Sequence, residues 1–127
     1  MLELEPLEGL RVVAEPAVLD RAVWHGDGVV VLRLAPDDAF ALDAWRVDVD
    51  DPAAIVEAER GFVGVWLTPD AIEAVVVPHL EWPLPNERPA LAQGAIAGVP
   101  GKLWLTDDGA LLLTPAAYAE ELARRLR

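Results

Sequence analysis

The stretch Lys102-Leu-Trp-Leu-Thr-Asp-Asp-Gly-Ala-Leu-Leu-Leu-Thr-Pro115 decides the fold of this chain. Two apolar runs flank the step Asp108-Gly109. An Asp-Gly step between apolar runs is the strongest short-range signal for a β-hairpin, because both residues tolerate the backbone angles of a tight turn. The sequence therefore predicts two antiparallel strands, 102–106 and 110–114, joined by a turn at 107–109.

Further apolar runs outside this hairpin predict five more strands. They are Leu10–Ala14, Val29–Ala35, Ala44–Val49, Phe62–Leu67 and Ala92–Ala97. In the third of them, Trp45, Val47 and Val49 alternate with Arg46, Asp48 and Asp50, which is the pattern of a strand with one apolar and one charged face.

Helical periodicity appears in three segments, Pro16–Trp24, Pro69 to about Val77, and the stretch from Pro115 to the end of the chain. In the last segment Tyr118, Leu122 and Leu126 form one apolar stripe. Together these elements predict one α+β domain over residues 1–127. It has a mostly antiparallel sheet, about three helices packed on it, and an amphipathic C-terminal helix.

An apolar run followed by Pro and an Ala-containing segment occurs three times, with Pro36, Pro69 and Pro115 at the joints. Each joint predicts a strand that leads directly into a helix, because Pro fits the first helical position. Thr68 and Thr114 precede two of these prolines and are predicted N-caps. Both an internal duplication and a chance recurrence of this common joint fit the pattern.

The composition excludes several classes of function. Asp and Glu number 22 against 10 Lys and Arg, which gives a formal net charge of -12. This charge disfavours binding to nucleic acid and to anionic membranes. The chain contains neither Cys nor Ser, so disulfides, thiolate metal sites and Ser or Cys nucleophiles are excluded. The many Ala and Arg residues indicate GC-rich coding.

The segment 79–94 concentrates residue types that are rare in this chain. It contains one of the two His residues and the only Asn and Gln residues, on a stretch stiffened by three prolines. Such a grouping is typical of a recognition surface, although a loop that caps the sheet with a buried Trp also fits. The candidate binding residues are His79, Glu81, Trp82, Asn86, Arg88 and Gln93.

The motif His25-Gly-Asp-Gly28 places an imidazole two residues from a carboxylate. A glycine-rich turn between a helix and a strand explains these residues on backbone grounds. His25 and Asp27 are therefore only weak candidates for metal ligands, and no cofactor or catalytic residue is predicted.

The C-terminal third resembles the end of the gamma subunit of heterotetrameric sarcosine oxidase and its folate-binding aminomethyltransferase relatives. The residues that carry the resemblance are Ala97-Gly-Val-Pro-Gly-Lys-Leu-Trp104, Gly109-Ala-Leu-Leu-Leu113 and Tyr118-Ala-Glu-Glu-Leu122. Leu32-Arg-Leu-Ala-Pro-Asp-Asp38 shares the strand, Pro and acidic pattern of those proteins. The resemblance implies an accessory, non-catalytic α+β subunit, and no active-site residue carries over.

The leading hypothesis is a cytoplasmic, non-catalytic domain that binds a protein partner, or a second copy of itself, through residues 79–94. The first alternative is a small-molecule binding or enzymatic domain with a pocket lined by the same loop. The second is an acidic antagonist or nucleic-acid mimic, which the net charge supports. The acidic N-terminus and the short apolar runs predict neither a secretory signal nor a membrane span.

Overall fold

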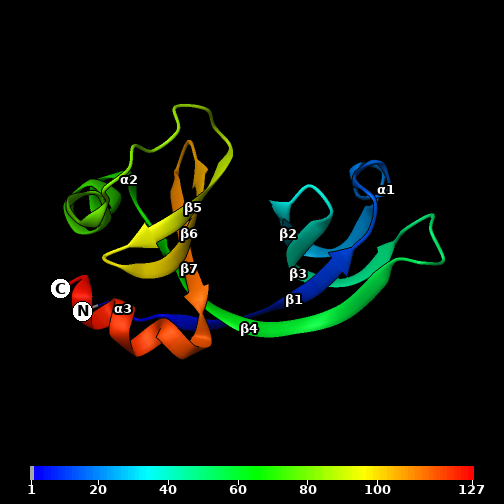
Figure 1. Cartoon of the computed structure of the whole chain (residues 1–127), viewed down its shortest axis with the longest axis horizontal. Helices are drawn as coiled ribbons and strands as arrows, with labels where there is room; N and C mark the ends of the chain where they lie inside the picture. The colour runs from blue at the N-terminus through cyan, green and yellow to red at the C-terminus, as the bar shows by residue number, and fades with distance from the viewer. Residues whose placement is uncertain (1) are drawn as a thin grey trace. The chain divides into compact units, whose positions relative to one another are not determined.

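Seven strands and three short α-helices follow one another in the computed structural model, which describes residues 2–127 (Figure 1). The strands are β1 (Glu5–Val13), β2 (Val23–Ala35), β3 (Asp38–Asp48), β4 (Ile55–Leu67), β5 (Ala90–Ile96), β6 (Val99–Thr106) and β7 (Gly109–Pro115). The helices are α1 (Pro16–Asp20), α2 (Pro69–Ala71) and α3 (Ala119–Arg125), with a π-helical turn η1 (Ile72–Val76) and 3₁₀ turns η2 (Val77–His79) and η3 (Ala116–Tyr118).

The strands are hydrogen-bonded in the order β2-β3-β1-β4-β7-β6-β5. The pairs β1–β3, β2–β3, β4–β7, β5–β6 and β6–β7 are antiparallel. The predicted α+β class with an antiparallel sheet is therefore confirmed, and each of the seven predicted strands lies within an observed one or overlaps it.

The chain divides into two compact units. One unit consists of residues Leu7–Gly61, and the other joins the residues up to Pro6 with Phe62–Arg127. We call them the Leu7–Gly61 unit and the Phe62–Arg127 unit. The long strand β4 contributes its first half to the former and its second half to the latter.

In the Phe62–Arg127 unit, β7 is the most completely buried strand, because every residue from Gly109 to Thr114 is inaccessible to solvent. Its backbone pairs with β4 on one side and β6 on the other, so its polar groups are satisfied in the ladders. The predicted hairpin is confirmed, since Thr106 pairs with Gly109 across the turn.

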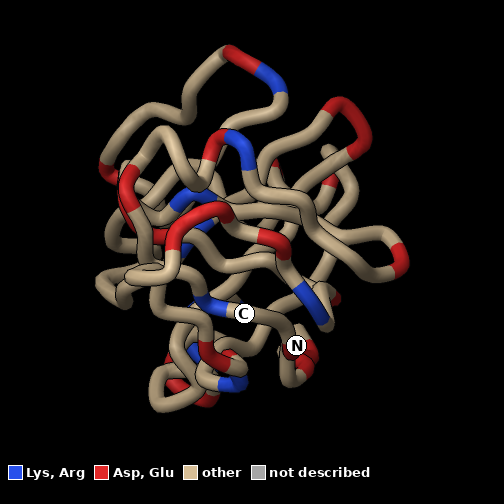
Figure 2. Tube along the Cα trace, turned by 90° about the vertical axis from the view of Figure 1, so that its right-hand side faces the viewer, with Lys and Arg blue, Asp and Glu red and all other residues tan. Residues whose placement is uncertain are grey.

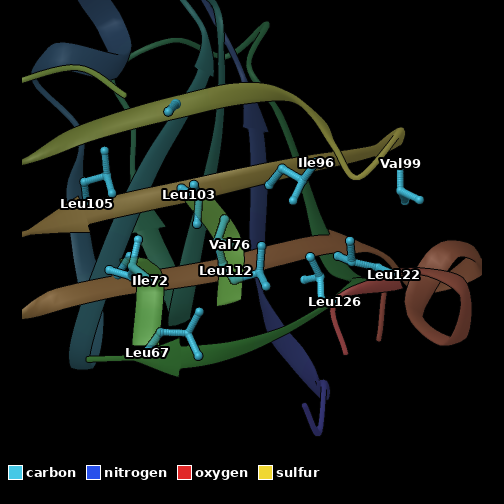
Figure 3. Packing of buried hydrophobic residues seen from close by; sticks show 12 residues of the cluster. Leu67, Ile72, Val76, Ile96, Val99, Leu103, Leu105, Leu112, Leu122 and Leu126 are labelled. Carbon is cyan, nitrogen blue, oxygen red and sulfur yellow. The ribbon is translucent and has the colours of Figure 1, made fainter. Parts of the chain in front are cut away.

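The helical segments cover one face of this sheet (Figure 3). Leu103 and Leu112 on the strands, Val76 on η1, and Leu122 of α3 are all fully buried in one cluster. Leu126, directly after α3, joins the same cluster, while Arg124 and Arg127 are exposed. Because burial of each such side chain stabilises by roughly 1.5–3 kcal/mol, this cluster holds the helices to the strands.

In the Leu7–Gly61 unit, a smaller cluster of Val12, Val18, Leu19 and Ala39 packs α1 against the strands. Beside it, Arg11 on β1 binds Asp38 with two hydrogen bonds of 2.6 and 2.7 Å. Its Nη1 also donates to Glu59 Oε1 on β4 at 2.8 Å. The bond to Asp38 raises the pKa of the Arg11 guanidinium against the opposing effect of burial, and Glu59 adds to the rise. One cation thus links β1, β3 and β4.

Two sequence predictions about helices are wrong for tertiary reasons. No helix follows Pro36, which instead forms the β2–β3 turn with Asp37, because Ala35 pairs with Asp38 and the strand that follows is buried between β1 and β2. Pro and Asp serve such turns as well as they serve a helix start. The helix from Pro16 ends at Asp20, since Trp24 pairs with Val47 in the β2–β3 ladder.

The two predicted threonine caps differ in outcome. Thr68 caps α2 as predicted, because its Oγ1 accepts a hydrogen bond from Ala71 N at 3.2 Å. Thr114 caps nothing, since it lies buried within β7 and its Oγ1 donates to the Pro100 carbonyl at 2.7 Å. The ladder with β4 extends through Pro115, so the chain becomes helical only after it.

Gly109 provides a test of the hairpin that organises the Phe62–Arg127 unit. Its φ of +146° is one that residues with a side chain rarely adopt, and a Cβ there would lie 2.1 Å from the Leu67 carbonyl oxygen. Gly109→Ala is expected to lower the free energy of unfolding by about 3 kcal/mol or more. Gly28→Ala is the control, because φ is +63° there but no atom lies within 4 Å of the added Cβ, so the loss is about 1 kcal/mol. Chemical denaturation measures the free energy of unfolding of both variants. Equal losses would contradict the steric argument, because they would show that the structure relieves the close contact of the added Cβ.

Arg11 provides a test of the link between β1, β3 and β4. Arg11→Lys replaces a planar group that bonds Asp38 twice and Glu59 once by a single ammonium, so we expect a loss of about 1–2 kcal/mol in the free energy of unfolding. Arg60→Lys is the matched control, since Arg60 is exposed and lies 3.9 Å from Glu8; its loss is below about 0.5 kcal/mol. A variant Arg11→Lys as stable as the control would contradict the assigned role.

Candidate functional site

The predicted recognition segment 79–94 leads into β5, the last strand in the sheet order, and its last five residues belong to that strand. Ala97 N donates to the His79 carbonyl at 3.1 Å, and Trp82 Nε1 donates to the Ala95 carbonyl at 2.8 Å. These bonds cover a strand edge that would otherwise present unpaired backbone groups.

Trp82 is half-buried and packs against the core cluster of the Phe62–Arg127 unit. Its indole lies directly over Gly94 of β5, because a Cβ on Gly94 would come within 3.0 Å of it. Gly94 is therefore required for the close approach of the ring to the strand.

The other candidate residues of the segment are not gathered at one place. Arg88 Nη1 donates to the carbonyls of Pro85 and Glu87, at 2.6 and 2.7 Å. Gln93 Oε1 accepts from Lys102 Nζ at 2.7 Å across the β5–β6 pair, and Asn86 is exposed.

Two separate hollows border the segment. His79, Glu81 and Trp82 line one of about 350 Å³, whereas Arg88 lines another of about 260 Å³ beside Asp107. The role of these residues in recognition stays a prediction.

The motif His25–Gly28 lies in β2 and does not form the predicted turn. The register of β2 against β3 shifts between His25 and Gly26 and again before Val30, so this part of the strand is bulged. A Cβ on Gly26 would lie 2.2 Å from the Asp43 carbonyl oxygen, which explains the glycine by backbone contact.

His25 pairs with Asp48 of β3 and not with Asp27. Its Nε2 lies 2.8 Å from Asp48 Oδ2, and Arg46 Nη2 lies 3.1 Å from the same ring nitrogen. The hydrogen bond holds the pKa of Asp48 below its ordinary value, and the charge of Arg46 acts in the same direction. Within residues 2–127, no three His, Asp or Glu side chains are grouped as metal ligands.

Trp45, next to this pair, is the feature that the sequence analysis missed. Its side chain is 69% exposed, although the alternating pattern placed it on the apolar face of a strand. The register of β3 against β2 skips Trp45, because His25 pairs with Arg46 and Gly26 pairs with Ala44, so Trp45 lies at a β-bulge. The bulge interrupts the alternation, which explains why Trp45 is exposed while Val47 packs against the apolar cluster. The only sequence signal was the aromatic ring beside Arg46 among acidic residues.

The indole of Trp45 is held in place from its own chain. The guanidinium carbon of Arg46 lies 5.5 Å from the ring centroid, within the range of a cation–π contact. The His25 ring is 6.1 Å from it at a tilt of 49°. An exposed aromatic ring fixed by two neighbours loses little conformational entropy when it binds a ligand.

Trp45 also lines a hollow of about 380 Å³ on the Leu7–Gly61 unit, which we call the Trp45 groove. Residues of β1, β3 and β4 form it: Glu8, Gly9, Leu10, Asp43, Ala44, Trp45, Ala58 and Arg60. Gly9 is required on its floor, since a Cβ there would lie 2.1 Å from the Ala41 carbonyl oxygen. Neither His25 nor Arg46 lines the groove, so they contact Trp45 outside it.

The charged residues of the groove differ in whether they have an ion-pair partner. Glu8 lies 3.9 Å from Arg60, a loose and exposed ion pair. Asp43 is exposed and, among the described residues, has no ion-pair partner. Its φ of +68° is uncommon for a residue with a side chain, although Asp tolerates it better than most. Asp43 lies at a β2–β3 register shift and lines the groove.

Comparisons with protein-family models, with curated proteins and with solved structures found no match to this chain. The resemblance of the C-terminal third to the gamma subunit of sarcosine oxidase therefore stays a prediction. No helix within residues 2–127 has the length and apolar character needed to cross a membrane.

The His25–Asp48 pair yields a prediction about titration. His25→Phe removes the main cause of the lowered pKa of Asp48, so that pKa is expected to rise toward the ordinary Asp value. The contact in the wild type is complete above the ordinary Asp pKa and is lost as the pH falls through the lowered one. Carboxyl-carbon NMR titration measures the change. Asp27→Asn is the control and leaves the Asp48 titration in place; a titration unaffected by His25→Phe would refute the pairing.

Proposed function

We propose that this chain is a non-catalytic protein-interaction domain that binds a positively charged segment of a partner protein in the Trp45 groove. The observation that carries the proposal is the 69% exposure of Trp45, which lines a groove and has the Arg46 guanidinium in cation–π range of its ring. Trp is among the residues that most often dominate the energy of protein interfaces.

The charges around the groove support a cationic ligand. Asp43 places an unpaired carboxylate in the same hollow as the indole of Trp45. A Lys or Arg side chain that entered the groove would meet this carboxylate and the negative face of the ring together. No side chain of the groove itself offers a free cation to compete, because Arg60 is turned toward Glu8.

The charge of the whole chain supports the same kind of partner. Asp and Glu residues occur along the entire trace, with fewer Lys and Arg between them (Figure 2). A field of this sign attracts a basic protein surface and raises its association rate. The accessory, non-catalytic role that the sarcosine oxidase resemblance implies agrees with a domain of this type.

The groove has better support than the segment 79–94 as the recognition surface. Trp82, Arg88 and Gln93 each make hydrogen bonds within the chain, and Trp82 is packed on Gly94. These contacts favour a structural role for the three side chains. Trp45, by contrast, presents most of its surface to solvent.

A pair of short peptides tests the proposal. An acetylated peptide of Gly residues with three interspersed Arg residues is expected to bind and to shift the amide NMR signals of Asp43 and Ala44. Trp45→Ala is expected to weaken this binding at least about fivefold, the loss of about 1 kcal/mol that a cation–π contact supplies. The same peptide with Gln in place of Arg is expected not to bind.

Trp66→Ala is the matched control, because Trp66 is 54% exposed but does not line the groove. We expect it to keep the affinity for the Arg peptide within about twofold of the wild type. Equal weakening by the two Trp substitutions, or binding of the Gln peptide as strong as that of the Arg peptide, would refute the proposed site.

A further inference from the structure

The two halves of β4 differ in what pairs with them. The pairing with β7 covers Phe62–Leu67 and does not extend to residues 55–61. On its other side β4 neighbours β1, and the contact of Arg11 with Glu59 lies in the first half. Among the described residues, no strand pairs with residues 55–61 on the side away from β1. An edge of this kind is a template for a strand from another chain.

The first half of β4 is also open on its two faces. Ile55 is 55% exposed and Val56 is 44% exposed, and Glu57, Ala58 and Arg60 are exposed as well. A strand of seven residues is long enough to pair with an extended peptide, and its exposed apolar side chains supply contact area for alternate residues of that peptide.

The other free edges of the sheet are protected. At the end of β5, the Trp82 side chain donates to the Ala95 carbonyl, and Ala97 N donates to the His79 carbonyl. Strand β2 shifts register three times against β3, and bulges of this kind hinder edge-to-edge pairing. Residues 55–61 contain no proline, and within residues 2–127 no comparable segment covers them. Within this half of β4, the Gly61 N–H donates to Glu59 Oε2 at 3.0 Å.

The charges of this edge disfavour a second copy of the chain. If two copies paired antiparallel about Ala58, Glu57 of each would lie opposite Glu59 of the other. Like charges directly opposite in a sheet are destabilising. Glu59 is partly neutralised by Arg11, whereas Glu57 is exposed and has no ion pair among the described residues. A strand with Lys or Arg opposite Glu57 would remove the repulsion and gain an attraction.

We infer that residues 55–61 of β4 form a docking edge that accepts, by strand addition, an extended partner segment in which basic and apolar residues alternate. The basic side chains share the face of Glu57, and the apolar ones pack over Val56 and Ala58. This inference rests on the proposed protein partner, but it does not require that Trp45 take part.

Backbone methylation of a model peptide tests the pairing directly. The probe is acetyl-Lys-Val-Arg-Val-Lys-Val-amide, made unmodified, with N-methyl groups on the three basic residues, or with N-methyl groups on the three Val residues. Charge is the same in all three peptides. In strand addition, alternate N–H groups face β4, so one methylated peptide loses at least about tenfold in affinity and the other stays within about threefold. Equal affinities of the two methylated peptides, or no binding of the unmodified one, would overturn the inference.

Charge reversal on the protein locates the edge. Glu57→Lys is expected to weaken binding of the unmodified peptide at least about tenfold, while its circular dichroism stays that of the wild type, because the side chain is exposed. Asp50→Lys is the matched control, because Asp50 is an exposed residue of the same unit and the substitution changes the net charge equally. We expect its affinity for the unmodified peptide to stay within about threefold of the wild type. Equal weakening by both would show attraction to the net charge alone and would overturn the edge.

The proposed Trp45 groove and the proposed docking edge can be refuted independently of each other. If the two methylated peptides differ while Trp45→Ala leaves the Gly-Arg peptide bound, the docking edge stands and the Trp45 groove is refuted. If Trp45→Ala weakens the Gly-Arg peptide while the two methylated peptides bind equally, the groove stands and strand addition is refuted.

Discussion

The burial of β7 is the constraint on which the Phe62–Arg127 unit depends. Six consecutive residues of this strand, Gly109–Thr114, are inaccessible to solvent, so their backbone groups must be paired on both sides. β4 and β6 provide that pairing, and η1 and α3 cover the apolar side chains of one face. Gly109 allows the tight turn into β7 beside the Leu67 carbonyl. Once this strand is in place, the positions of its neighbours follow.

The Leu7–Gly61 unit combines a smaller apolar cluster with a charged group that joins three strands. Arg11 joins β1 to Asp38 and Glu59 through three hydrogen bonds. Such a multiple contact fixes register and orientation, because the planar guanidinium accepts only a narrow range of geometries. Val47 at the end of β3 packs against the apolar cluster of this unit, whereas Trp45 and Ile55 are exposed.

Both proposed contact surfaces lie where strand pairing stops. Trp45 follows the last pair of β1 with β3, and residues 55–61 precede the first pair of β4 with β7. Side chains on unpaired ends are not needed for packing, so they are free to serve recognition. The acidic charge of the chain selects among partners more than it strengthens any single contact, since exposed charges are screened by salt.

Local patterns along the chain predicted the secondary structure well and its exact ends less well. The seven apolar runs became strands, the Asp108-Gly109 step became a hairpin, and Thr68 became a cap, because each depends on residues within a few positions of itself. Pro36 and Thr114 misled for the opposite reason: the same residues suit a turn, a strand or a helix start, and pairing with distant strands decided between them.

The candidate site lay beyond local patterns altogether. The segment 79–94 stood out by composition, yet hydrogen bonds to β5 and β6 engage Trp82 and Gln93. Trp45 shared the apolar face of its strand by alternation and proved exposed, because a β-bulge, set by pairing with β2, interrupts the alternation at this residue. The sequence by itself determined the elements, the hairpin and the charge. Tertiary structure alone decided which edges and rings stay open, since burial depends on contacts between residues far apart in the chain.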